Sequence, residues 1–70
     1  MSNAQKMPPA RAIWMRYTNQ DGKAHVVEHQ VWDKDIFLAT REDEAAGERA
    51  RGNAKVKVEQ ITQEQYRSER

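Results

Sequence analysis

The chain has 70 residues, a third of them charged, and a formal net charge of only +1. It lacks cysteine, which excludes a disulfide framework, a zinc ribbon and any other thiolate metal site. No apolar run approaches the roughly 20 residues that span a bilayer, and the N-terminus lacks the apolar region of a signal peptide. We therefore expect a soluble, cytoplasmic protein with no membrane partner.

The chain length allows one domain at most. Residues 1–10 are polar, contain Pro8-Pro9 and show no hydrophobic periodicity. We predict that they form a disordered N-terminal tail. Residues 11–70 are then expected to form a single α+β domain.

The segment 12–32 has the alternating pattern of two strands joined by residues 19–23, Asn-Gln-Asp-Gly-Lys. This turn favours a three-residue loop with Gly22 as a left-handed bulge. It pairs Met15 with Val27, whereas a two-residue loop at Asp21-Gly22 would place Met15 against Glu28. A slip of one residue turns a strand over, so the three-residue loop is the better interpretation. The predicted core face consists of Ile13, Met15, Tyr17, His25, Val27, His29 and Val31.

A helix is predicted after Trp32, with Asp33 as its N-cap. Its apolar anchor is the run Ile36, Phe37 and Leu38, and beyond this run only charged residues and small alanines follow. The helix ends either at Gly47 or at Gly52-Asn53. We favour the later end because residues 48–51 are good helix formers.

Residues 54–61 return to a strand pattern, and residues 62–65 fit a capping box that opens a short helix from Gln63 to about Ser68. The helix between the second and third strands makes these two strands parallel. The third strand lies either beside the second or antiparallel to the first. We favour pairing with the first, which centres the core face under the helix. The predicted fold is a small β-β-α-β-α α+β domain. It has a three-stranded sheet, one main helix on one face, a short C-terminal helix and an open second face.

Catalysis is not expected. The only serines, Ser2 and Ser68, lie near the chain ends, and the glycines are too far apart for a phosphate loop. His25 and His29 share one strand face but lie about 13 Å apart, too far to share a metal ion without distant ligands. We interpret them as imidazoles at the rim of a half-buried sheet, with their hydrogen bonds made to neighbouring groups. No catalytic residue, cofactor, metal or small-molecule substrate is predicted.

The open face favours a protein-interaction function, as in an adaptor or inhibitor-like regulator, with a protein partner or a second copy bound there. An apolar strip flanked by charges is typical of a contact core with a polar rim. An alternative for the tryptophan at the centre of the strip is burial under the tail or the C-terminal helix. The predicted partner-binding residues are Trp14, Arg16, Val26, Glu28 and Trp32.

The charge pattern supports an alternative function. Residues 33–48 hold six acidic and two basic residues, a net of −4, whereas residues 49–57 hold four basic and no acidic residues, a net of +4. Such blocks are common on solvated faces. Beside Trp14, however, the basic block would suit a single-stranded nucleic acid. The residues of this alternative nucleic-acid site are Arg49, Arg51, Lys55 and Lys57.

Overall fold

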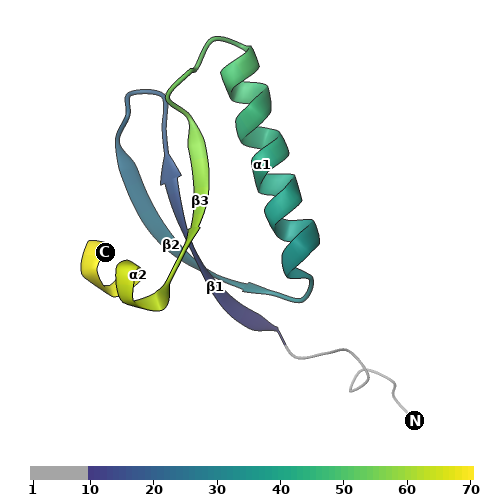
Figure 1. The fold of residues 1–70 in the computed structure, drawn as a ribbon, viewed down its shortest axis with the longest axis vertical. Coiled ribbons are helices and arrows are strands. Elements are labelled where there is room, and N and C mark those ends of the chain that lie inside the picture. Colours follow the sequence, from purple (N-terminus) through teal and green to yellow (C-terminus); the bar gives the residue numbers. More distant parts are fainter. Residues whose placement is uncertain (1–9) are drawn as a thin grey trace.

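A computed structural model describes residues 10–70 and confirms the α+β class and the element order. The elements are β1 (Arg11–Thr18), β2 (Ala24–Val31), α1 (Lys34–Ala50), β3 (Lys57–Ile61) and α2 (Gln63–Glu69), as Figure 1 shows. The predicted N-terminal tail lies outside the described residues, apart from Ala10. Neither α1 nor α2 has the length and apolar character that crossing a membrane requires.

The hairpin has the predicted three-residue loop. The Asn19 N–H donates to the Lys23 carbonyl (2.9 Å), and the Gly22 N–H donates to the Asn19 carbonyl (3.0 Å). Gly22 has φ +87°, which glycine adopts without strain. The resulting antiparallel register places Met15 opposite Val27 and is unbroken along both strands. The register prediction is confirmed.

The sheet has the order β2-β1-β3, with β1 at its centre and antiparallel to both neighbours. The two outer strands therefore run parallel to each other, and the third strand pairs with the first, as favoured from the sequence. The edges of the sheet are β2 and β3.

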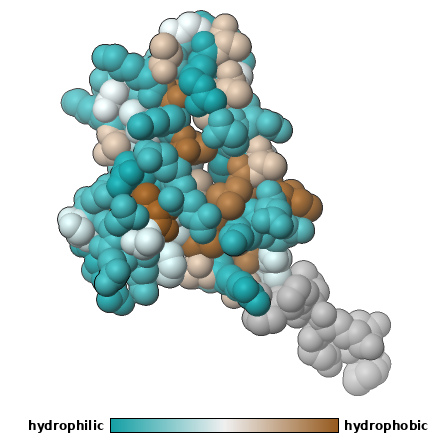
Figure 2. All heavy atoms as spheres, in the orientation of Figure 1, coloured by the Kyte–Doolittle hydropathy of each residue, from teal (hydrophilic) through white to brown (hydrophobic). Residues whose placement is uncertain are grey.

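The core lies between α1 and the sheet. Ile13, Met15 and Val31 are buried there, and Tyr17, Phe37, Leu38 and Val58 pack around them. Figure 2 shows several of the hydrophobic residues of the visible face gathered between α1 and the sheet, with hydrophilic residues over most of the remainder. In α1 only Ala45 is buried, as the thin apolar stripe of that helix indicates.

The expected apolar anchor of α1 is only partly correct. Phe37 and Leu38 are half-buried, but 65% of Ile36 is exposed. Three consecutive residues span about 200° of a helix circumference, so all three cannot face one sheet. Ile36 therefore projects away from the core.

The ends of α1 follow the predicted signals. The Ile36 N–H donates to the Asp33 carboxylate (3.0 Å), which caps the helix. The helix passes Gly47 and ends at Ala50, just before Gly52 at φ +105°. The later end is confirmed.

The third strand begins at Lys57 and not at residue 54. The Val56 N–H donates to the Asn53 carbonyl (3.1 Å), which holds residues 53–56 in a turn. Ala54 and Lys55 are thereby removed from the sheet. The prediction began the strand too early because small and charged residues already alternate from residue 54.

The C-terminal helix corrects the prediction that the second sheet face is open. Thr62 and Gln65 form the expected capping box, and the helix then contacts both β1 and β2. The face beneath it carries Trp14 opposite Ile61, of which only 6% is exposed. The α2 helix therefore covers part of the face that α1 does not.

Gly22→Ala is expected to lower the free energy of unfolding by on the order of 1 kcal/mol. A Cβ at this left-handed position would also lie 3.3 Å from Lys55 Cδ. Chemical unfolding of the variant measures the effect. Gly47→Ala is the matched control. It lies within α1, its new Cβ would meet nothing closer than 3.8 Å, and alanine favours a helix. An equal loss in both variants would contradict the role assigned to the turn.

Candidate protein-binding surface

Trp14 and Arg16 lie on the sheet face that α2 partly covers. The Arg16 Nε donates to Glu69 of α2 (2.8 Å), and its Nη1 reaches Glu59 of β3 (3.3 Å). The bond to Glu69 chiefly raises the pKa of Arg16 and lowers that of Glu69. Trp14 is half-buried. These two predicted contact residues therefore lie where they hold α2 on the sheet.

Val26 and Glu28 lie on the same face but on the outer strand β2. Val26 is half-buried and Glu28 is exposed. Within the described residues, Glu28 accepts a hydrogen bond only from the side chain of Gln30 (3.4 Å). The structure thus separates the predicted contact residues into a pair beside α2 and a pair at the sheet edge.

Trp32 lies at the end of β2, and 61% of its surface is exposed. Together with Ile36 it lines a shallow groove of about 360 Å³ between this strand end and the first turns of α1. These two are the large apolar side chains most exposed among residues 10–70. Sequence reasoning placed Ile36 in the core and so missed this apolar pair.

Among residues 10–70, no other strand pairs with the outer edge of β2. In an antiparallel hairpin, the backbone N–H and C=O groups of successive residues point alternately toward the partner strand and away from it. Given the bond between Asn19 and Lys23, the backbone groups of His25, Val27 and His29 point toward β1. The N–H and C=O groups of Ala24, Val26, Glu28 and Gln30 consequently point outward.

The two edges of the sheet differ in their protection. Proteins usually blunt an edge strand with lysine, proline, a bulge or short length. The eight-residue β2 carries one charged residue, Glu28, but it is long and has no lysine, proline or bulge. The five-residue β3 is shorter and carries Lys57 and Glu59. The edge of β2 is therefore the one suited to pairing with another strand.

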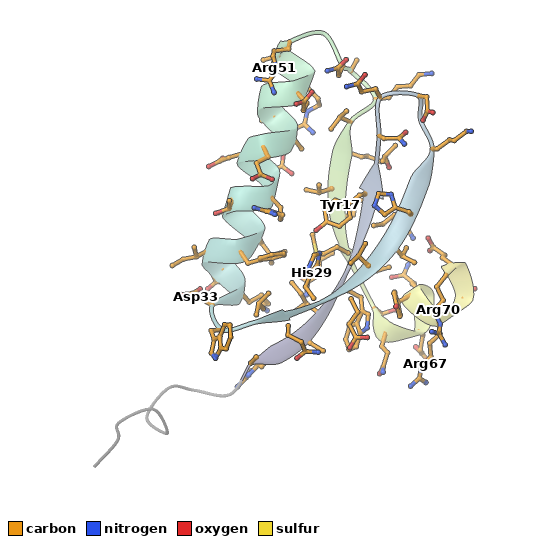
Figure 3. The ribbon with its side chains drawn as sticks, turned by 180° about the vertical axis from the view of Figure 1, so that it is seen from behind. Tyr17, His29, Asp33, Arg51, Arg67 and Arg70 are labelled. Atoms are coloured by element: carbon orange, nitrogen blue, oxygen red, sulfur yellow. The ribbon has the colours of Figure 1, made fainter. Side chains whose placement is uncertain are left out.

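An aromatic cluster lies on the opposite face, beneath α1. The Tyr17 hydroxyl and the His29 Nε2 are 2.6 Å apart, as the two labelled side chains in Figure 3 indicate. His25 stacks on Tyr17 with ring centroids 5.5 Å apart, and His29 lies 4.8 Å from the Phe37 ring. Within residues 10–70, no three His, Cys, Asp or Glu side chains come together as metal ligands would. Both histidines pack against aromatic rings of this cluster.

Lowering the pH from about 7.5 to about 5.5 is expected to destabilise the fold through His29. Burial lowers the pKa of this imidazole from its usual 6.5, and the positive charge of Arg41 acts in the same direction. The unfolded chain then binds the proton more readily, so the contribution present above pH 6.5 is lost as the pH falls through the lowered pKa. Urea unfolding at the two pH values measures this loss.

The His29→Gln variant should show a smaller pH dependence over this range. His25→Gln retains the Tyr17–His29 contact and is the control that should behave as the unmodified chain does. An unchanged dependence in His29→Gln would contradict the assignment.

The predicted nucleic-acid residues are divided among local contacts. Arg49 pairs with Glu42 (2.7 Å) and donates to the Val56 carbonyl (3.0 Å), while Arg51 pairs with Glu48 (2.6 Å). Lys57 lies 3.6 Å from Glu59, and Lys55 sits in the turn before β3 beside Gly22. Lys57 shares the sheet face of Trp14, whereas Arg49 and Arg51 belong to the C-terminal end of α1.

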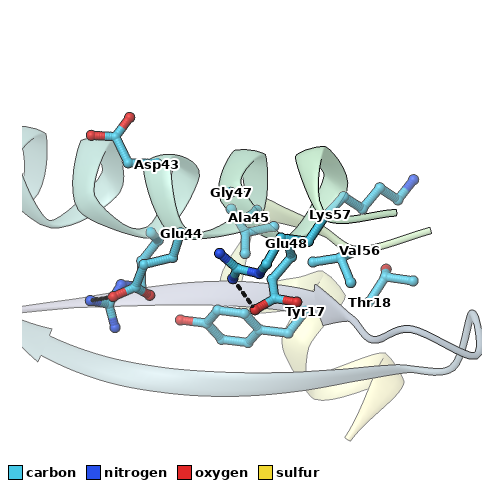
Figure 4. A pocket seen from close by; sticks show the side chains of 12 residues that line it. Tyr17, Thr18, Asp43, Glu44, Ala45, Gly47, Glu48, Val56 and Lys57 are labelled. Atoms are coloured by element: carbon cyan, nitrogen blue, oxygen red, sulfur yellow. Dashed lines mark hydrogen bonds and ion pairs between the residues drawn. The ribbon is translucent and has the colours of Figure 1, made fainter. Parts of the chain in front are cut away.

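A second groove, of about 520 Å³, lies between the C-terminal half of α1 and the sheet. Ala45 and Gly47 are too small to fill the space above the Tyr17 ring, as Figure 4 shows. The Glu48–Arg51 ion pair lies on its wall. The groove is the consequence of the thin apolar stripe in α1.

No protein-family model matches the chain, and neither does any curated protein or solved structure.

Proposed function

We propose that this chain is a non-enzymatic protein-binding domain, acting as an adaptor or inhibitor-like regulator. Its contact surface is the outer edge of β2 together with Trp32 and Ile36. Of the residues predicted from the sequence, Val26, Glu28 and Trp32 belong to this surface. Trp14 and Arg16 instead support α2.

The observation that carries the proposal is the exposure of Trp32 and Ile36 at 61% and 65%. Single exposed apolar residues are common. Two large ones that line one groove beside a long edge strand without lysine, proline or a bulge resemble a binding site. An added strand would obtain affinity from backbone hydrogen bonds, and the apolar groove would accept a side chain.

The nucleic-acid alternative has less support from the geometry. Arg49 and Arg51 already pair with carboxylates, and an acidic block lies beside them. Salt dependence separates the two functions, because phosphate binding weakens steeply as salt rises. A complex dominated by apolar and backbone contacts should persist.

Trp32→Ser and Ile36→Ser are each expected to weaken partner binding about tenfold or more, as loss of an apolar anchor does. The measurement is quantitative affinity capture from the source cell at high salt and after nuclease treatment. Ala46→Ser, an exposed change farther along α1, is the control. Equal recovery of the same proteins by the chain and by both serine variants would contradict the proposed surface.

A further inference from the structure

We propose that the partner is a second copy of this chain, joined through the outer edge of β2. This inference rests on the proposed function and names its partner. The two β2 strands would run antiparallel across a twofold axis perpendicular to the sheet, so that two three-stranded sheets become one. Such self-complementary contacts are the commonest form of protein oligomer.

Symmetry limits how the two edges can pair. Residues directly opposite each other in an antiparallel pair point to the same face. Each residue of one copy must therefore face either the same residue of the second copy or a residue whose number differs from its own by an even number. Two registers satisfy this condition and use almost the whole strand, one centred on Val27 and one on Glu28.

Charge decides between the two registers. Centring on Glu28 would place this carboxylate directly against its copy, which is destabilising. Centring on Val27 places the two Val27 side chains in contact and sets Glu28 opposite Val26. His25 then meets His29, and Ala24 meets Gln30. All the backbone groups that point outward from residues 24–30 find partners in this register.

The molecule leaves room for this arrangement. The main sheet contact of α1 is with β3, at the other edge, whereas Val27 is half-buried and His25 is exposed. The α2 helix packs on the sheet face opposite α1, where it contacts β1 and β2. Continuing the Val27-centred register brings Trp32 opposite Gly22 in the turn of the second copy. Part of the exposed indole would then be covered.

Sedimentation equilibrium of the full chain over roughly 1–500 µM, a range that covers micromolar dissociation constants, tests the proposal. We expect a monomer–dimer equilibrium. Glu28→Pro should weaken association at least about tenfold, because proline removes an outward N–H and blocks the edge. Gln60→Pro is the matched control on the edge of β3, where the register makes its N–H point outward too. It should leave association unchanged.

A second variant tests the register itself. Val26→Lys would create two symmetric Lys–Glu28 pairs and should tighten association about two- to thirtyfold. In the Glu28-centred register the same lysine would meet Gln30 and have no such effect. Circular dichroism of each variant verifies that the fold is intact.

A chain that stays monomeric at every concentration would overturn the inference. If it also captures a different protein through Trp32 and Ile36, the proposed function stands and only the second copy is wrong. A dimer insensitive to Glu28→Pro would place the interface elsewhere and likewise overturn the inference.

Discussion

Met15→Ala is expected to lower the free energy of unfolding by about 2–5 kcal/mol. Met15 lies on the central strand, only 1% of it is exposed, and it is part of the buried cluster with Ile13 and Val31. The alanine would leave a cavity at the place where sheet and helix meet. Urea unfolding followed by circular dichroism measures the loss.

The contrast with an exposed residue makes this prediction specific. Trp32→Ala removes a larger side chain, but one that is mostly in solvent, so its effect on unfolding should stay within about 0.5 kcal/mol. A loss in Trp32→Ala as large as that in Met15→Ala would contradict the assignment of Trp32 to the surface.

Trp14→Ala is expected to destabilise the fold by about 2–3 kcal/mol, less than a fully buried tryptophan would, because the side chain is half-buried. Trp14 lies opposite the buried Ile61, on the face that α2 covers. Its removal should loosen α2 as well as expose Ile61. Thermal unfolding measures the total loss, and hydrogen exchange in α2 reports the local one.

Arg16→Met is a useful companion to Trp14→Ala. It keeps much of the side-chain stem but removes the bonds to Glu69 and Glu59. It should raise exchange in α2 with a smaller overall loss than Trp14→Ala causes. If the Trp14→Ala variant keeps its full stability but associates more weakly, Trp14 instead belongs to the binding surface.

The features that could be predicted from the sequence depend on local chemistry. The Asn-Gln-Asp-Gly-Lys turn requires positive φ at Gly22, and this alone determines which residues face each other along the hairpin. Asp33, Gly52 and the Thr62–Gln65 pair mark helix ends through bonds within a few residues. For the same reason, the core around Met15 followed directly from the register.

The position of α2 depends on tertiary packing, and the sequence offered it only as an alternative, the burial of Trp14 under the C-terminal helix. One signal was available in the sequence. Ile61 continues the alternation of Lys57 and Glu59, so an apolar residue ends the otherwise charged side of β3 and shares a face with Trp14. Because only Thr62 separates Ile61 from α2, the helix must turn back close to that face.

Ile36 illustrates a different limit. Composition indicates an apolar start to α1, but the rotation of the helix about its axis decides which of three consecutive apolar residues is buried. That rotation is set by contacts with the sheet, where Phe37 meets His29. The binding surface proposed for this chain therefore depends on a residue that the sequence pattern assigned to the core.

The central claim is that the outer edge of β2 binds a second copy of the chain. Hydrogen exchange along β2 tests this claim most directly. The amides of His25, Val27 and His29 bond to β1 and should be protected at every protein concentration. Those of Val26, Glu28 and Gln30 point outward, and their protection should rise with concentration as the dimer forms. If these outward amides exchange at the same rate at low and high concentration, the edge of β2 is not the interface and the claim is wrong.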